Sequence, residues 1–193
     1  SLPLDLIPSS PRLRKTEREL IYELTAKKYS MEALQGQVGR RLRDDFNLLK
    51  SDYDVIICDC PPGISVMTES VLAASHLIIV PTIPDFMSTL GLDLFTGDIM
   101  QNLRDRDIES LPVVLATRYD DTPHQKVVLQ AMREAANSKE AEFEMFNTVI
   151  PLKSGFASNP IELGPDPTLA AKWPGEALGI IDKLLKEVQE RLK

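Results

Sequence analysis

Short apolar runs alternate along this chain with longer segments in which apolar residues recur every three to four positions. The runs are nearly continuous and rich in β-branched residues, a pattern typical of strands that are buried on both faces of a parallel sheet. The pattern predicts five strands, at residues 4–8, 54–59, 77–80, 112–116 and 148–150.

Four helices are expected between and after these strands. Ser30 and Asp85 are suited to cap two of them, and Thr122 followed by Pro123 marks the start of a third. The fourth closes the chain. Their apolar positions are Met31, Leu34, Val38, Leu42, Phe46 and Leu49 in the first, Phe86, Leu90, Leu94, Ile99 and Met100 in the second, Val127, Val128 and Met132 in the third, and Leu178, Ile181, Leu184, Leu185, Val188 and Leu192 in the last. This order predicts an α/β fold, a doubly wound and mostly parallel sheet with helices on both faces.

The size and composition of the chain indicate one ordinary globular domain over residues 1–193. A chain of 193 residues, 43% hydrophobic and 26% charged, can bury a core without help from disulfides or metals. The net charge of −7 argues against coating of nucleic acid through bulk charge. No apolar run approaches the ~18 residues of a transmembrane helix, and residues 1–8 lack the features of a signal peptide. We therefore expect a cytoplasmic protein.

The two cysteines, Cys58 and Cys60, lie two residues apart in a predicted strand. Their side chains would point to the same side of the strand, but an extended pair of this kind has poor geometry for a disulfide. Neither His76 nor His124 adds ligands at the spacing of a zinc site. We expect two reduced, buried thiols that pack as small hydrophobic groups, in keeping with a cytoplasmic protein.

The end of the second predicted strand carries the clearest candidate chemistry. Ligands of open α/β sheets bind outside the carboxyl ends of the strands, and Asp59 stands at such an end. Pro61, Pro62 and Gly63 then take the chain out of regular structure. A carboxylate fixed there can hold Mg²⁺, usually through water, against a bound phosphate. The alternative is that Asp59 only caps a turn or the following helix.

Residues 53–62, Tyr-Asp-Val-Ile-Ile-Cys-Asp-Cys-Pro-Pro, resemble the Walker B strand of the ParA/MinD family of ATPases, whose ParA branch partitions plasmids and chromosomes. Four further segments resemble ParA proteins in the same order and at similar spacing: residues 4–10, residues 77–92 with the strand Leu-Ile-Ile-Val-Pro and the helix after Asp85, residues 115–120, and residues 148–151, Thr-Val-Ile-Pro. Each motif is weak by itself, but five in order favour the ParA branch over MinD proper.

The resemblance implies a metal and switch region in one segment. Asp59 would be the Walker B carboxylate, which takes part in catalysis by placing Mg²⁺ through water. Pro61, Pro62 and Gly63 would begin the switch region that responds to the γ-phosphate of ATP.

The resemblance also implies a binding site for the base of ATP. Arg118 would lie near the base, and Pro151 and Lys153 would line the adenine pocket. Simpler interpretations stay open: Arg118 pairs with Asp120 or Asp121, Pro151 only ends a strand, and Lys153 is only solvated.

A phosphate-binding loop is missing from the chain. A P-loop ATPase needs a glycine-rich loop with Gly-Lys-Ser/Thr, whose amides and lysine neutralise the phosphates. None of the nine glycines here is followed by lysine. Residues 36–40, Gly-Gln-Val-Gly-Arg, lie inside a segment of helical period. We expect the chain to be the carboxyl-terminal two-thirds of a ParA-like ATPase domain, either a fragment or a natural protein that has lost hydrolysis.

For the full-length protein, the resemblance implies a ParA-type ATPase for plasmid or chromosome partitioning. Mg²⁺-dependent ATP hydrolysis would be coupled to homodimerisation, nonspecific DNA binding and stimulation by a ParB-like partner, with a cytoplasmic, nucleoid-associated location. This chain alone would be inactive. Two alternatives stay open: a non-catalytic ParA-like binding or dimerisation module in which Asp59 is vestigial, and another positioning ATPase of the ParA/MinD superfamily.

Basic residues do not single out a DNA-binding or membrane-binding surface. Each basic cluster is interleaved with acidic residues, which is typical of a solvated helix face. In the closing helix Glu187 and Glu190 alternate with lysines, so packing on the sheet is favoured over binding to a membrane. The clusters are Arg12/Arg14/Lys15/Arg18, Arg40/Arg41/Arg43 and Lys183/Lys186/Arg191/Lys193.

Overall fold

The structure is a computed structural model that describes residues 5–8, 10, 12–61, 63, 65–104, 111–153, 156, 168–173 and 175–193. The chain divides into two compact units, unit 1 (Ser1–Ser75) and unit 2 (His76–Lys193), each with its own packing. The expectation of a single domain over residues 1–193 stays a prediction.

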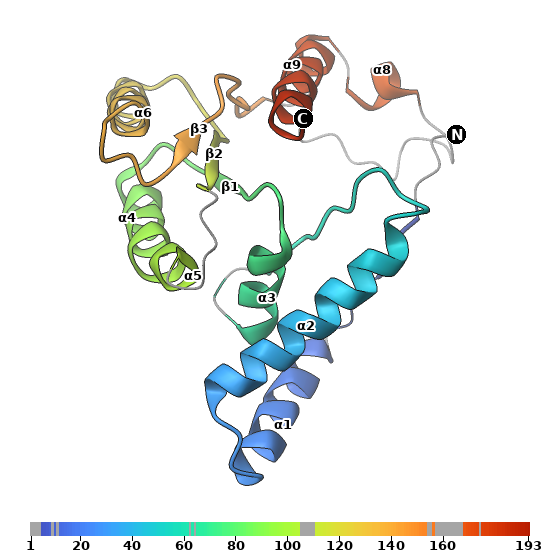
Figure 1. The fold of residues 1–193 in the computed structure, drawn as a ribbon. Helices are drawn as coiled ribbons and strands as arrows, with labels where there is room; N and C mark the ends of the chain where they lie inside the picture. Colours follow the sequence, from blue (N-terminus) through green and yellow to red (C-terminus); the bar gives the residue numbers. More distant parts are fainter. Residues whose placement is uncertain are drawn as a thin grey trace. The chain divides into compact units, whose positions relative to one another are not determined.

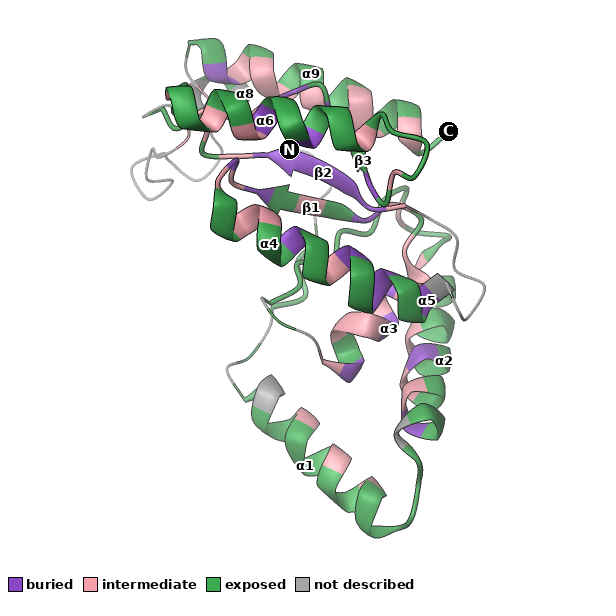
Figure 2. Ribbon diagram, turned by 90° about the vertical axis from the view of Figure 1, so that its left-hand side faces the viewer, coloured by how far each residue is buried: buried purple, intermediate pink, exposed green. Residues whose placement is uncertain are grey.

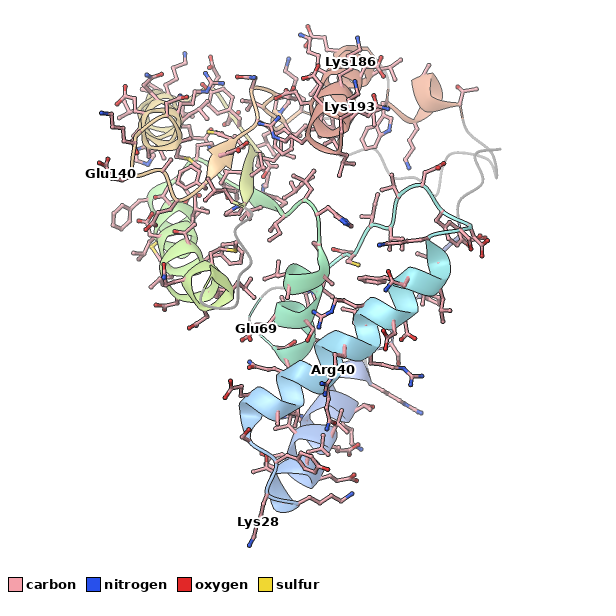
Figure 3. All side chains as sticks on the ribbon, viewed as in Figure 1. Lys28, Arg40, Glu69, Glu140, Lys186 and Lys193 are labelled. Carbon is pink, nitrogen blue, oxygen red and sulfur yellow. The ribbon has the colours of Figure 1, made fainter. Side chains whose placement is uncertain are left out.

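Unit 1 is built from helices. Its helices are α1 (Leu13–Ala26), α2 (Met31–Leu49) and α3 (Val66–Ala74). Lys28 lies at the tip of the turn between α1 and α2 (Figure 3), with a φ of 64°. Ser30 caps α2 as predicted, since its Oγ accepts a hydrogen bond of 3.2 Å from the amide of Ala33. Ser65 caps α3 in the same way.

The contact between α2 and α3 forms the packed part of unit 1. Leu34 of α2 is 2% exposed, and Val66 and Leu72 of α3 are also buried. Beside them Gln35 Nε2 donates a hydrogen bond of 2.6 Å to Glu69 Oε2. The apolar face that the sequence predicts for α2 is therefore covered by a helix that the sequence pattern did not single out.

Residues 54–61 form no strand in the structure, so the strand expected at 54–59 is wrong for this part of the chain. Ile57 is 86% exposed and Val55 57% exposed. A strand is stabilised by hydrogen bonds to a neighbouring strand, and none of the described residues pairs with this segment. Residues 5–8 are likewise exposed and outside any strand. Residue 4 lies outside the described residues.

The two cysteines share the environment of this segment. Cys58 and Cys60 are both free and exposed. The prediction of buried thiols is therefore wrong, because it assumed a strand with neighbours on both sides.

Unit 2 contains a parallel sheet. Its strands are β1 (Ile79–Thr82), β2 (Val113–Ala116) and β3 (Glu144–Met145), in the order β1-β2-β3. β2 confirms the strand predicted at 112–116, and β1 begins two residues later than the strand predicted at 77–80. The strand expected at 148–150 is wrong, since these residues form no strand in the structure. They still lie against the end of β2, where the amide of Ile150 donates a hydrogen bond of 2.8 Å to the carbonyl of Ala116.

Helices cover both faces of this sheet. Figure 1 shows α4 and α6 on one side of it and α9 on the other, and Figure 2 shows the strands between α6 above and α4 below, with α9 behind α6. The caps predicted at Asp85 and Thr122 are confirmed by their hydrogen bonds to the amides of Ser88 and Gln125. The helices of unit 2 are α4 (Phe86–Leu94), the π-helix η1 (Phe95–Met100), α5 (Gln101–Arg104), α6 (Pro123–Ala136), α8 (Leu169–Lys172) and α9 (Glu176–Arg191).

Alternate side chains of β2 form the two halves of the core. Val114 is fully buried between Leu92 of α4 and Met132 of α6. Val113 and Leu115 point to the opposite face, where the core also contains Phe146 and is covered by Leu184 and Val188 of α9. A central strand buried on both faces by helices confirms the predicted α/β fold.

The exposed side of α4 differs from the prediction. Phe86, Leu90 and Leu94, expected on the packed side, are 69%, 45% and 59% exposed. Ile99 and Met100 are buried as expected. Ile99 and Met100 belong to the π-helix η1, whose turns are wider than those of an α-helix and change which side chains face the sheet. An unbroken α-helical period therefore cannot predict the packed side of this segment.

Candidate functional site

The carboxyl end of β2 leads into a tight, unusual turn. Arg118 has a φ of 52° and Asp121 a φ of 54°, the left-handed region that non-glycine residues seldom adopt. Tyr119, between them, pairs with Pro151 in a parallel bridge. Its amide donates to the carbonyl of Ile150 at 3.1 Å. Two strained residues thus lie at the sheet edge where an α/β fold binds ligands.

Side chains hold this turn in place. Lys126 Nζ lies 3.0 Å from Asp121 Oδ2, and the hydroxyl of Tyr119 donates to Asp121 Oδ1 at 2.8 Å. The hydrogen bond from Lys126, followed by that from Tyr119, lowers the pKa of the Asp121 carboxyl. Among the described residues no ion pair joins Arg118 to Asp120 or Asp121, so that interpretation of Arg118 is wrong. The exposed guanidinium of Arg118 is left for another role.

The strain at Arg118 predicts an unusual response to substitution. Arg118→Gly should keep the free energy of unfolding or raise it by up to about 1 kcal/mol, because glycine adopts this φ without penalty. Arg118→Val should lower it by about 1–2 kcal/mol, because a β-branched side chain is poorly tolerated at positive φ. Urea unfolding measures both. Thr117→Gly, at a neighbour without positive φ, should be destabilising; a loss at Arg118→Gly of the same size would contradict the account.

Pro151 and Lys153 lie directly beside this turn. Pro151 is half-buried, and the amide of Leu152 donates to the carbonyl of Tyr119 at 2.9 Å. Lys153 Nζ lies 2.6 Å from Glu176 Oε2, in the first turn of α9, and its hydrogen bond lowers the pKa of that carboxyl. Lys153 is thus exposed but ion-paired rather than only solvated. The structure brings the three candidate base-binding residues, Arg118, Pro151 and Lys153, to one edge of the sheet.

The candidate metal and switch residues belong to unit 1. Asp59 and Pro61 are exposed, and Gly63 has a φ of 102°, which only glycine adopts readily. Pro62 lies outside the described residues. Within the described part of the chain, no hydrogen bond or ion pair engages the Asp59 carboxylate. A hard, unengaged oxygen donor suits a water-mediated contact to Mg²⁺. The catalytic and switch roles of this segment stay predictions.

The sequence pattern did not predict the aromatic pair formed by Phe156 and Trp173. The rings of Phe156 and Trp173 have centroids 5.7 Å apart and planes tilted by 47°. Lys172 Nζ lies 5.6 Å from the centre of the Trp173 ring. Trp173 is the single tryptophan of the chain, but it stands 17 residues after Phe156, a separation that gives no periodic signal to pair them.

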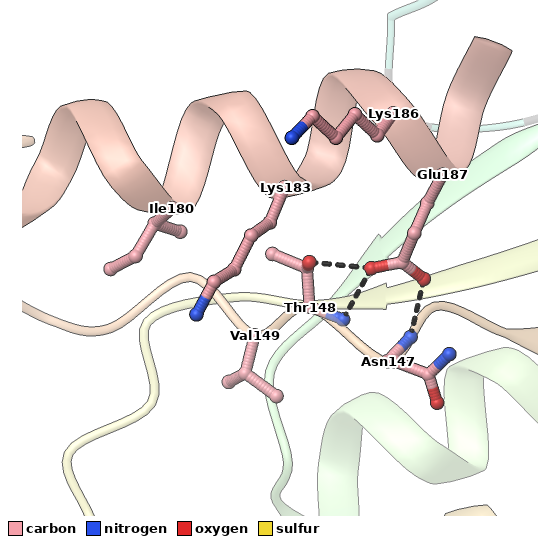
Figure 4. Close-up of a pocket in the computed structure, with 7 residues that line it drawn as sticks. All are labelled: Asn147, Thr148, Val149, Ile180, Lys183, Lys186 and Glu187. Carbon is pink, nitrogen blue, oxygen red and sulfur yellow. Dashed lines mark hydrogen bonds between the residues drawn. The ribbon is translucent and has the colours of Figure 1, made fainter.

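A pocket of about 500 Å³ lies between α9 and residues 147–149 (Figure 4). Glu187 closes one end of it, with Oε2 accepting from the amide of Asn147 at 2.7 Å and Oε1 from the amide and hydroxyl of Thr148. Partial burial raises the pKa of Glu187, but these hydrogen bonds outweigh it and leave the pKa lowered. Glu187 thereby fastens α9 to the sheet, which agrees with the expected packing of this helix.

Glu187→Gln should lower the free energy of unfolding by about 1–2 kcal/mol at pH 7, because the new amide group presents a donor to the amide of Asn147. A carboxyl whose folded pKa is lowered stabilises the fold above its unfolded pKa, about 4.3, and loses that contribution as the pH falls through the folded pKa. The difference in the free energy of unfolding between the unchanged protein and Glu187→Gln should therefore disappear in acid. Urea unfolding from pH 7 to pH 3 measures it, with exposed Glu190→Gln as the control. A gap that stays constant would contradict the role of the charge.

Two further searches of the described residues bear on function. They contain no group of three or more histidine, cysteine, aspartate or glutamate side chains gathered as a metal site. Within the same residues no helix has both the length and the apolar character needed to cross a bilayer.

The parallel sheet with helices packed on both faces defines an α/β protein. The family model described as an AAA domain matches residues 1–111, more than half of the chain. The chain therefore belongs to this ParA/MinD-like family of AAA domains, which confirms the resemblance found in the sequence.

Individual relatives agree with this family. An uncharacterised protein of Mycobacterium tuberculosis is 29% identical over 89% of the chain and 49% of its own length. The chromosome partitioning protein ParA of Myxococcus xanthus is 31% identical over 50% of the chain and 30% of its length. The sporulation initiation inhibitor protein Soj of Bacillus subtilis is 29% identical over 77% of the chain and 53% of its own length. The chain thus spans about half the length, or less, of the curated relatives it matches.

Proposed function

We propose that this chain is part of a ParA-type ATPase that partitions plasmids or chromosomes. The observation that carries the proposal is the junction of Tyr119 with Pro151, which gathers Arg118, Pro151 and Lys153 at the carboxyl edge of the sheet. The family match, which covers the segment of Asp59, supports the same conclusion, as does a relative named for chromosome partitioning.

One group of residues in this chain binds the base of ATP, and another binds the metal. Pro151 offers a half-buried apolar surface for the adenine, and the exposed cationic side chains of Lys153 and Arg118 come from the same edge of the sheet. Asp59 holds Mg²⁺ through water, and Pro61, Pro62 and Gly63 begin the segment that responds to the γ-phosphate. When bound, Mg²⁺ neutralises negative charge on the phosphates while the γ-phosphoryl group is transferred to water.

The phosphates need a further contribution. Backbone amides and a lysine of a glycine-rich loop supply most of the affinity of P-loop proteins for a triphosphate. No Gly-Lys pair occurs in these 193 residues. We therefore place the loop in a segment of the full-length protein that precedes this chain, which agrees with the partial coverage of the relatives.

Partner binding follows from the same assignment. The full-length protein would form a homodimer around ATP, bind DNA without sequence preference through phosphate contacts, and respond to a ParB-like partner. It would work in the cytoplasm, on the nucleoid when bound to DNA. DNA binding of this kind weakens steeply with salt.

The test uses the full-length protein. It should hydrolyse ATP with Mg²⁺ and lose that activity in EDTA, and light scattering should report a dimer with Mg²⁺-ATP. If the coding sequence upstream holds no Lys-Gly-Gly-x-Gly-Lys-Thr-like loop, or no hydrolysis is detected, the proposal fails. A protein that dimerises without hydrolysing ATP would instead be a ParA-like binding module.

A further inference from the structure

We propose that Trp173 and Phe156 form an aromatic platform on which the base of the bound nucleotide stacks, an inference that rests on the nucleotide site proposed above. Stacking on an aromatic side chain suits any base, since every base has a flat π-face. The platform would add affinity for the base that Pro151 and Lys153 alone do not supply.

The platform lies close in the chain to the candidate base-binding residues. The amide of Phe156 donates to the carbonyl of Lys153 at 3.1 Å, so Phe156 follows Lys153 in a single backbone turn. Trp173 lies three residues before Glu176, whose carboxylate pairs with Lys153 at 2.6 Å. The backbone of Phe156 and the carboxylate of Glu176 therefore both contact Lys153, and the rings of Phe156 and Trp173 contact each other.

The rings of the platform are accessible. Trp173 and Phe156 are both only half-buried, although large aromatic side chains gain most from full burial. Their rings are tilted rather than stacked, so the pair does not cover both faces of the indole. Lys172, which is exposed, contacts the Trp173 ring through its ammonium group. Such a flexible cation can give way to a base.

The charge around the platform also suits a nucleotide. A nucleotide combines a flat base with negatively charged phosphates. Lys172 places an ammonium group over the indole, and Lys153, whose carbonyl accepts from the Phe156 amide, adds a second positive charge in the same segment. Aromatic rings next to cations match this combination of π-face and negative charge. Glu176, which already pairs with Lys153, would keep that lysine in position.

The experiment is a titration of the full-length protein with Mg²⁺-ATP, read by tryptophan emission and, separately, by calorimetry. The part of the emission that is lost in Trp173→Phe reports on Trp173. We expect that part to be quenched as ATP binds. Trp173→Ala should weaken ATP binding about tenfold, which corresponds to about 1.4 kcal/mol, whereas Trp173→Phe keeps a ring and should weaken it less than threefold. Phe86→Ala, an exposed aromatic of α4, is the matched control and should bind ATP as the unchanged protein does.

Each other result overturns the platform. If calorimetry shows ATP binding while the Trp173 emission and the affinity of Trp173→Ala stay unchanged, the rings only pack, and the proposed function survives without them. If calorimetry shows no ATP binding at all, the proposed function fails and the platform with it. If the Trp173 emission responds to a single-stranded oligonucleotide and not to ATP, the two rings bind nucleic acid rather than the base of ATP.

Discussion

Asp59→Ala should reduce Mg²⁺-dependent ATP hydrolysis by the full-length protein at least about 100-fold. The effect follows from the chemistry of the site, since removal of one group that stabilises transition-state charge typically costs about 10²–10³ in rate. The carboxylate is exposed and makes no hydrogen bond or ion pair to other described residues, so its loss should leave the fold intact. Steady-state release of phosphate measures the rate, and circular dichroism checks the fold.

A matched variant separates this role from a general effect of charge. Asp54 lies in the same segment, is also exposed and also carries one negative charge. Asp54→Ala should keep most of the hydrolysis rate. Equal losses for the two variants, or full activity of Asp59→Ala, would contradict the assignment of Asp59 to Mg²⁺.

Phe146→Ala should have the largest effect on stability, lowering the free energy of unfolding of unit 2 by about 3–5 kcal/mol. Phe146 is 1% exposed and packs with Val113 and Leu115 of β2 under Leu184 and Val188 of α9. The guanidinium of Arg191 also lies 4.8 Å from its ring centre, an interaction that alanine removes. Urea unfolding followed by circular dichroism measures the loss.

Phe86→Ala is the control for this loss. The same side chain is truncated there, but Phe86 is 69% exposed. The free energy of unfolding should change by no more than about 0.5 kcal/mol, as for most surface substitutions. A loss at Phe146 no larger than that at Phe86 would show that α9 does not pack on the sheet as described.

Local signals in the sequence predicted the starts of three helices and the central strand of the sheet. Ser30, Asp85 and Thr122 cap the helices that were expected to follow them, because an N-cap hydrogen bond reaches only a few residues along the chain. The strand at 112–116 was found because it is buried on both faces and therefore apolar at every position. The α/β fold followed from the order of such elements.

The predictions that failed depended on neighbours rather than on local pattern. The segment 54–59 has the composition of a buried strand, but a strand forms only where another strand accepts its hydrogen bonds. The exposure of Cys58 and Cys60 has the same origin. In α4 the packed side depends on the π-helix that follows. A pattern of apolar residues every three to four positions assumes an unbroken α-helix and does not detect it.

The candidate site was predictable only in part. Arg118, Pro151 and Lys153 were identified through resemblance to a family, and the structure brings them to one sheet edge. The left-handed backbone at Arg118 could not be predicted, because arginine has no preference for it. The contact between Phe156 and Trp173 joins residues far apart in the sequence, and so depends on the fold of the segment between them.

The proposed ATPase has its metal-binding and base-binding residues in this chain and its phosphate-binding loop in a preceding segment of the full-length protein. Calorimetry with Mg²⁺-ATP tests it most directly, on these 193 residues and on the full-length protein side by side. We predict binding at least about 100-fold tighter for the full-length protein, equivalent to about 2.8 kcal/mol, because the loop supplies most of the phosphate contacts. Equal affinity of the two proteins at micromolar ATP would contradict the claim.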